Sequence, residues 1–123
     1  MLIFKLLLVG LGGFCGAILR YAISRWIENR KSSTLPTATL IVNIAGSFLL
    51  GVLIGLDLTK TWFLLCGTGI LGAFTTFSTF KLEAIQLHIN KRWKGFTYYV
   101  LASYFFGICL AYTGFKLGRW FML

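Results

Sequence analysis

The feature that most constrains this chain is a series of long apolar stretches without a charged residue. Three of them cover residues 37–56, 62–80 and 96–115, and each approaches the roughly 20 residues that a helix needs to cross about 30 Å of hydrocarbon. A fourth begins at the N-terminus, where Lys5 and Arg20 bracket an apolar run. Lys5 can reach the interface, and this helix can then continue to about Ala22. We therefore expect an all-α membrane protein with four transmembrane helices, forming a single domain over residues 1–123.

The low share of charged residues supports a membrane protein, whereas the distribution of basic residues says little about how the protein is oriented in the membrane. Only 12% of the residues are charged, about half the share in soluble domains. The net charge of +9 comes mostly from short loops, which favours helix-flanking charge over nucleic-acid binding. Six basic residues fall at one end of the expected helices and four at the other: Arg25, Arg30, Lys31, Lys91, Arg92 and Lys94 against Lys5, Lys60, Lys116 and Arg119. So weak a bias predicts an uncertain topology or insertion in both directions.

The expected helices cover residues 3–26, 37–56, 62–88 and 96–116, with polar connections at 27–35, 57–60 and 90–95. No cleavage site follows the first helix, so we do not expect it to be a removed signal peptide. The third helix would be about 39 Å long at 1.5 Å per residue, more than the bilayer needs. Glycines at 67, 69 and 72 precede a hydroxyl-rich run. We therefore expect the third helix to be broken near residues 72–76.

The run Gly72-Ala73-Phe74-Thr75-Thr76-Phe77-Ser78-Thr79-Phe80 is the principal candidate site. Membrane segments carry polar groups mainly where they function. A break there would free backbone carbonyls, which must be satisfied internally or by an ion. Unwound carbonyls coordinate Na⁺ in transporters, so Gly72 and Thr75 are candidate cation ligands.

Phe77 and Phe80 lie on one face of the expected second half-helix. Such a pair is commonly core packing. Here Ser78 and Thr79 lie between the two rings and Glu83 lies one turn beyond Thr79. Aromatic rings carry positive edges, so ring edges and hydroxyl donors together can solvate a small anion. A lysine would hold such an ion too tightly to conduct it.

Two further polar features each allow two interpretations. Thr39, Asn43 and Ser47 recur every four residues and share one helix face. They are either hydrogen-bonding contacts between helices or part of a polar pathway. Arg20 lies well inside the first expected helix. It either extends to lipid phosphate or supplies a positive field that draws anions into a vestibule.

Other motifs indicate no additional chemistry. Residues 67–72 fit G-x-G-x-x-G, but that motif binds dinucleotides only between a strand and a helix. Three cysteines and a single histidine support neither a disulfide framework nor a zinc site. No nucleophile, base and orienting group can be assembled, so an enzyme is not expected. The pairs Gly12/Gly16 and Gly51/Gly55 predict close helix packing.

Three motifs together resemble the CrcB (Fluc) fluoride channels, in order and over the whole chain. They are Gly12-Gly13-x-x-Gly16-Ala17-x-x-Arg20-Tyr21, Thr39-Leu40-x-Val42-Asn43-x-x-Gly46-Ser47-Phe48-x-x-Gly51 and the run from Gly72 to Phe80. The resemblance implies a passive fluoride channel in the bacterial cytoplasmic (inner) membrane. It also implies an antiparallel, dual-topology homodimer within the lipid bilayer, with two pores and a structural Na⁺ on the two-fold axis.

The resemblance also implies roles for individual residues. Asn43 would contact fluoride, Phe77 and Phe80 would supply ring edges, and Gly72 and Thr75 would give carbonyls to Na⁺. The fluoride pathway implied for this chain comprises Thr39, Asn43, Phe77, Ser78, Thr79, Phe80, Glu83, Tyr99 and Ser103, with Arg20 in the vestibule. The alternatives are a small multidrug-type transporter, which needs a membrane-embedded acid absent from the first helix, and a structural membrane subunit.

Overall fold

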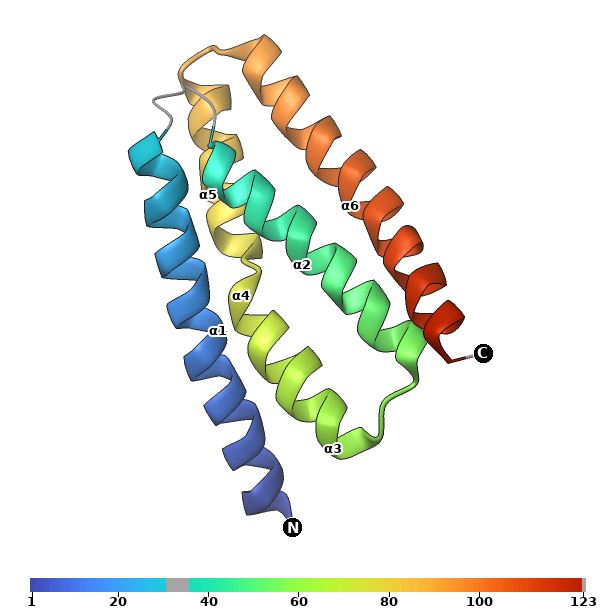
Figure 1. The fold of residues 1–123 in the computed structure, drawn as a ribbon. Helices are drawn as coiled ribbons and strands as arrows, with labels where there is room; N and C mark the ends of the chain where they lie inside the picture. The colour runs from blue at the N-terminus through green and yellow to red at the C-terminus, as the bar shows by residue number, and fades with distance from the viewer. Residues whose placement is uncertain (31–35, 123) are drawn as a thin grey trace.

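The computed structural model describes residues 1–30 and 36–122, and every regular element in these ranges is a helix. The helices are α1 (Leu2–Arg30), α2 (Thr37–Leu56), α3 (Lys60–Phe63), the π-helix η1 (Leu64–Leu71), α4 (Gly72–Phe74), α5 (Phe77–Ile89) and α6 (Trp93–Phe121) (Figure 1). Four helical segments are long and apolar enough to span a membrane: α1, α2, α6 and Lys60–Ile89. The prediction of an all-helical protein with four such segments is confirmed.

Three segments extend beyond the ends expected from the sequence. α1 continues to Arg30 instead of Trp26, α6 continues to Phe121 instead of Lys116, and the third segment begins at Lys60. A charged residue ends an apolar run but not the helix, because the backbone hydrogen bonds of a helix are internal and persist outside hydrocarbon. The connection expected at residues 27–35 is helical up to Arg30, and residues 31–35 lie outside the described residues.

Helices α2 and α6 run side by side with their backbones almost in contact (Figure 1). A Cβ added to Gly51 would meet the carbonyl oxygen of Ala111, and one added to Gly114 would meet that of Phe48. Gly55 and Gly118 are equally close to the opposite backbone. Glycine permits this separation because it has no side chain. The close packing predicted for the Gly51/Gly55 pair is confirmed.

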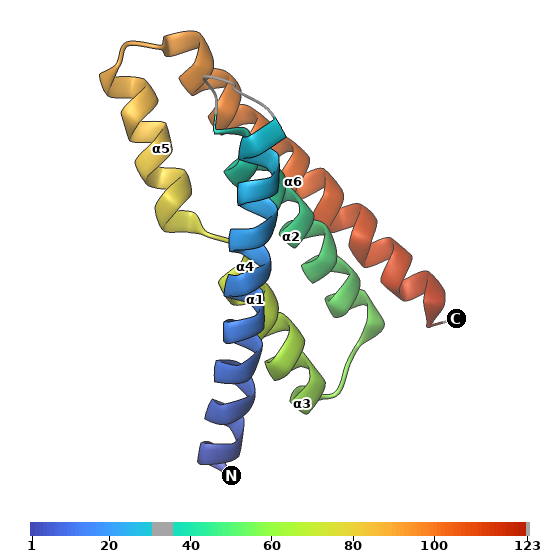
Figure 2. The same cartoon turned by 60° about the vertical axis from the view of Figure 1, so that its left-hand side comes forward.

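Helix α1 packs along the first part of the third segment in the same way (Figures 1 and 2). A Cβ on Gly12 would meet the Leu65 carbonyl oxygen, and one on Gly16 would meet that of Ile70. The predicted packing of Gly12 and Gly16 is therefore also confirmed, and both glycines contact η1.

The third segment is not a uniform α-helix. Residues Leu64–Leu71 form a π-helix, Gly72 keeps helical torsions, and Thr75 and Thr76 are extended, with ψ of 159° and 113°. The chain changes direction at these two residues, and α5 diverges from the line of η1 and α4 (Figure 1).

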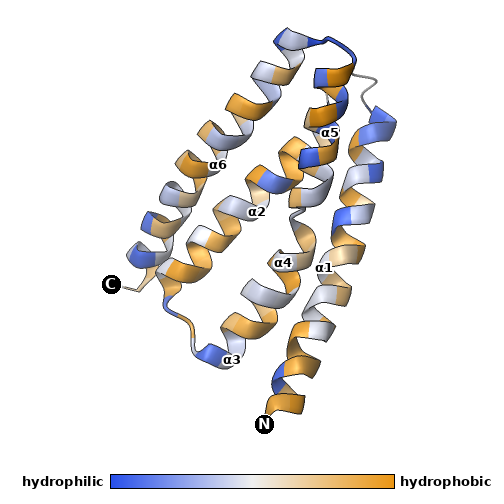
Figure 3. Ribbon diagram, turned by 180° about the vertical axis from the view of Figure 1, so that it is seen from behind, coloured by the Kyte–Doolittle hydropathy of each residue, from blue (hydrophilic) through white to orange (hydrophobic). Residues whose placement is uncertain are grey.

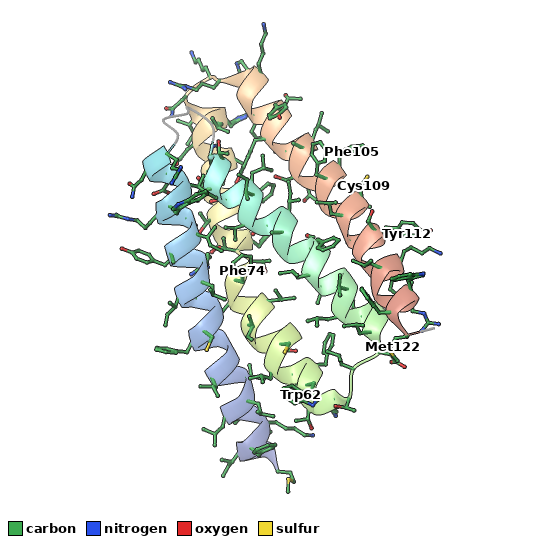
Figure 4. The ribbon with its side chains drawn as sticks, viewed as in Figure 1. Trp62, Phe74, Phe105, Cys109, Tyr112 and Met122 are labelled. Atoms are coloured by element: carbon green, nitrogen blue, oxygen red, sulfur yellow. The ribbon has the colours of Figure 1, made fainter. Side chains whose placement is uncertain are left out.

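Much of the surface of this single chain is apolar. Hydrophilic residues gather around the α5–α6 connection, the C-terminal end of α1 and the end of α6 (Figure 3). Phe105, Cys109 and Tyr112 lie on the outer side of α6, while Phe74 lies in the interior and is buried (Figure 4). Phe74 packs with Val42 and Leu71 in one core cluster. Such a surface suits contact with lipid or another apolar chain.

Candidate functional site

Asn43 binds the backbone of Thr76 through both ends of its side-chain amide. Its Nδ2 donates to the Thr76 carbonyl oxygen at 3.0 Å, and its Oδ1 accepts from the Thr76 N–H at 2.9 Å. The extended residue therefore makes the pair of hydrogen bonds that a neighbouring strand would supply. Since an amide nitrogen carries two N–H bonds, one donor of Asn43 remains for another acceptor.

Thr76 also caps helix α5. Its Oγ1 accepts from the Thr79 N–H at 3.3 Å, lies 3.1 Å from Thr79 Oγ1 and lies 3.5 Å from Ser78 Oγ. The three hydroxyls therefore form one exposed group at the start of α5. An N-cap side chain satisfies a first-turn N–H that has no partner within the helix. The role of Thr76 was not predicted, although a threonine directly before a helix is a capping signal.

The extended residues also release two carbonyl oxygens. In a continuous helix the carbonyls of Gly72 and Thr75 would accept from the N–H groups of Thr76 and Thr79. Here those N–H groups donate to Asn43 Oδ1 and Thr76 Oγ1 instead. Hard cations prefer oxygen ligands of this kind. Within the described ranges no cluster of three His, Cys, Asp or Glu residues gathers.

The rings of Phe77 and Phe80 share one face of α5, with centroids 6.0 Å apart. Their surroundings differ. Phe80 packs against Tyr99 at 5.2 Å and meets Tyr104 edge-on at 6.1 Å, whereas 68% of the Phe77 side chain is exposed. Phe80 is therefore partly a packing residue, and Phe77 contributes little to the packing of this chain. Tyr104 was not predicted, because sequence spacing pointed to Tyr99 and Ser103 alone.

Helix α2 makes a second polar contact with α5 through Thr39, whose Oγ1 donates to Glu83 Oε1 at 2.6 Å. Ser47 instead donates to the Asn43 carbonyl oxygen of its own helix at 3.0 Å. The stripe Thr39, Asn43 and Ser47 therefore contains two interhelical contacts and one local contact. Asn43 is compatible with both interpretations of the stripe: it forms a hydrogen-bonding contact between helices, and it keeps one N–H donor for a polar pathway.

Two hydroxyls of α6 are buried without a hydrogen-bond partner. The Tyr99 side chain is 1% exposed, and neither its hydroxyl nor Ser103 Oγ has a partner within the described residues. Buried polar groups are normally satisfied, so an unsatisfied pair indicates a site for water or an ion. Ser103 lines the cavity described next.

A cavity of about 490 Å³ brings much of the candidate site together between α2, the third segment and α6. The predicted site residues that line it are Asn43, Gly72, Thr75, Phe77, Phe80 and Ser103. The remaining ones are not among its lining residues: Arg20, Thr39, Ser78, Thr79, Glu83 and Tyr99. Thr39 and Glu83 form the separate α2–α5 contact, and Arg20 lies on α1, partly exposed.

Comparison with known proteins gives a consistent result. The sequence model described as "CrcB-like protein, Camphor Resistance (CrcB)" matches residues 7–115. A fluoride-specific ion channel FluC 2 of Bacillus thuringiensis subsp. konkukian is 54% identical over 91% of this chain and 95% of that protein. A FluC 1 of Geobacillus kaustophilus is 48% identical over 92% of this chain and 97% of that protein. A FluC 2 of Lactobacillus acidophilus is 42% identical over 90% of this chain and 94% of that protein. This chain therefore belongs to the CrcB family.

Proposed function

We propose that this protein is a fluoride-specific ion channel that exports fluoride passively across the cytoplasmic membrane of a bacterium. Its relatives carry the name of such channels, which are not enzymes. The single observation that carries the proposal is one cavity lined by the Asn43 amide and the rings of Phe77 and Phe80. These groups solvate an anion without a fixed positive charge.

The pathway combines donors with ring edges. Asn43 offers its second N–H, Ser103 offers an unpartnered hydroxyl, and Phe77 presents an exposed ring. We assign the hydroxyls of Ser78 and Thr79, with Glu83, Thr39 and Tyr99, to the polar track beyond the cavity. Arg20 adds a positive field at the entrance. Conduction requires contacts weak enough for the ion to move on, which neutral donors and ring edges can provide.

A passive pore suffices for export. Fluoride enters as the neutral acid HF, dissociates at neutral pH and is trapped inside as the anion. An inside-negative potential drives an anion outward with about 2.3 kcal/mol per elementary charge for each 100 mV.

We further propose that Thr75 and Thr76 break the third helix into two half-helices and that a Na⁺ ion occupies the break. The released carbonyl oxygens of Gly72 and Thr75 are its protein ligands. A bound cation would compensate the negative ends of these carbonyl dipoles. The carbonyl oxygens of Gly72 and Thr75 stay available because the N–H groups that would donate to them in a continuous helix are already bound. The Thr76 N–H donates to the Asn43 side chain, and the Thr79 N–H donates to the Thr76 side chain.

The complete channel in this proposal is an antiparallel, dual-topology homodimer in the lipid bilayer. Three observations support it: the near-even distribution of basic residues between the two ends, the open position of Gly72 with no heavy atom nearer than 3.9 Å to an added Cβ, and the exposed ring of Phe77. A second copy would cover the open side of the cavity.

Fluoride efflux from liposomes tests the function directly. Purified protein is reconstituted in liposomes loaded with potassium fluoride, and a fluoride electrode records release after valinomycin is added. We expect rapid release of fluoride and far slower release of chloride from matched vesicles. Release no faster than from protein-free liposomes would contradict the proposal.

Dual topology is tested separately by fusing the C-terminus to two reporters, one active only inside the cell and one only outside. We expect both to give signal. Signal from one reporter alone, with fluoride release intact, would exclude the antiparallel arrangement.

A further inference from the structure

A basic pocket of about 690 Å³ lies at the α5–α6 connection. Its lining includes Lys91, Arg92, Trp93, Lys94 and Tyr98. It shares no lining residue with the cavity that contains Phe77 and Phe80. Its volume is within the range of small-ligand sites. The pocket is therefore a second candidate site with its own chemistry.

The pocket concentrates positive charge without an internal counter-charge. Lys91, Arg92 and Lys94 are all exposed, and no acidic residue is among the lining residues. Three cationic side chains within four positions repel one another, and the attraction of each to a bound anion would offset that repulsion. Arginine and lysine are the side chains that bind phosphate oxygens.

The backbone contributes donors at the same place. Helix α6 begins at Trp93, and its N-cap residue Arg92 makes no side-chain capping hydrogen bond. The Phe96 N–H reaches the Arg92 carbonyl at 2.8 Å, so the N–H groups of residues 93–95 precede the first helical bond. Such groups form the positive end of the helix dipole, which favours anions. The start of α6 therefore adds to the positive potential of the pocket, whereas the case for an anion site rests on the basic side chains and the cavity.

The length of α6 places the pocket at the depth of lipid headgroups. Its 29 residues extend about 44 Å at 1.5 Å per residue, whereas the hydrocarbon is about 30 Å thick. The helix ends therefore project into the headgroup layers. Trp93 and Tyr98 are both more than half exposed, and such aromatic residues favour that interface.

We propose that the basic pocket binds a phosphate group, with the phosphate of an anionic lipid headgroup as the source that its depth favours. Lys91, Arg92 and Lys94 contact the phosphate oxygens, and Trp93 and Tyr98 pack against the adjoining glycerol and chains. Free inorganic phosphate has the same recognition chemistry, so the experiment separates the two sources. The inference does not depend on the proposed fluoride transport.

Lipid binding is measured on the purified protein in detergent by native mass spectrometry during titration with phosphatidylglycerol or phosphatidylcholine. The test variant is Lys91→Gln/Arg92→Gln, and the matched control is Lys116→Gln/Arg119→Gln at the other end of the molecule. Glutamine leaves the backbone preference at Lys91, which has a φ of 58°, nearly unchanged. Size-exclusion profiles confirm folding, and the two single variants give the result if the double variant does not fold.

We expect the test variant to bind phosphatidylglycerol about 25-fold more weakly, about five-fold or 1 kcal/mol per charge. The control variant should change less than two-fold, and phosphatidylcholine binding should be unaffected. Competition by millimolar inorganic phosphate would support the phosphate site with free phosphate as a second source. Absence of competition would support the lipid headgroup alone. Unchanged phosphatidylglycerol binding in the test variant, or an equal loss in the control, would overturn the proposal.

Discussion

Helices α2 and α6 meet backbone to backbone through glycines, whereas Thr76 is held to α2 through the side chain of Asn43. At these glycines the first interface contains almost no space, and no polar side chain joins the two backbones there. The second borders a cavity, leaves one Asn43 donor unused and lies beside two released carbonyls. The comparison teaches that the glycine contacts of α2 and α6 form the rigid framework, and that polar, underfilled structure lies where α2, the third segment and α6 border the cavity.

The largest effect is expected from a side chain at the framework interface. In Gly114→Val the added Cβ would meet the Phe48 carbonyl oxygen, so α2 and α6 must separate. We expect a loss of about 3 kcal/mol or more, seen as loss of the folded peak in size exclusion and a lower melting temperature. Gly10→Ala is the control, because nothing lies within 4 Å of its added Cβ. A stable Gly114→Val protein would refute the framework assignment.

The second effect concerns the amide that joins α2 to the extended segment. Asn43→Ala removes two hydrogen bonds to Thr76 and a proposed fluoride donor. It should destabilise the chain by about 1–3 kcal/mol and reduce fluoride flux at least ten-fold. Asn43→Asp should be worse, because it sets a carboxylate oxygen against the Thr76 carbonyl and repels the anion. Flux in Asn43→Asp equal to that of Asn43→Ala would show that repulsion of the anion is unimportant here.

The third test separates packing from ion contact at the two rings. Phe77→Ile should change stability by less than about 0.5 kcal/mol because Phe77 is exposed. Phe80→Ile should cost about 1 kcal/mol because it loses contacts with Tyr99 and Tyr104. Both variants should reduce fluoride flux strongly if the ring edges face the ion. Melting temperature and liposome flux are measured together, and wild-type flux in both folded variants would leave the pair as packing residues.

The smallest effect on the chain itself is expected at Gly72. A Cβ there has no neighbour closer than 3.9 Å, so Gly72→Ala should shift stability by less than about 1 kcal/mol. We nevertheless expect impaired flux or dimer assembly, worsening in Gly72→Leu, because the proposed cation and second copy lie at this position. Assembly is followed by cross-linking and flux by fluoride release. Full activity in both variants would argue against a cation and a partner at Gly72.

Much of the fold could be predicted because hydropathy locates the middle of each spanning helix directly. The ends could not, because α1 continues past the expected end at Trp26 to Arg30, where the apolar pattern has already stopped. The glycine pairs were predicted to pack closely, but their partners were not named. Nothing local to Gly12 indicates that its neighbour is Leu65.

The residues of the candidate site could be predicted, but their pairing could not. Asn43 was predicted as an anion contact, yet half of its hydrogen-bonding capacity is used by Thr76, 33 positions away. Thr39 and Glu83 were placed on the pathway separately, and their contact spans 44 positions. Helical spacing orders residues within one helix and carries no information on which faces meet.

The π-helix η1 has a consequence for how the chain tolerates changes of length. Deleting one residue of α2 ahead of Asn43 would rotate every later side chain of that helix by about 100° relative to the preceding ones, so Asn43 would no longer meet Thr76. Each i→i+5 bond of Leu64–Leu71 closes a loop that contains one more residue than the loop closed by an α-helical bond. A single-residue deletion there can be absorbed by conversion to i→i+4 bonding, which leaves the orientation of Gly72 and the residues after it largely intact. A single-residue deletion is therefore expected to be better tolerated in η1 than in the part of α2 before Asn43.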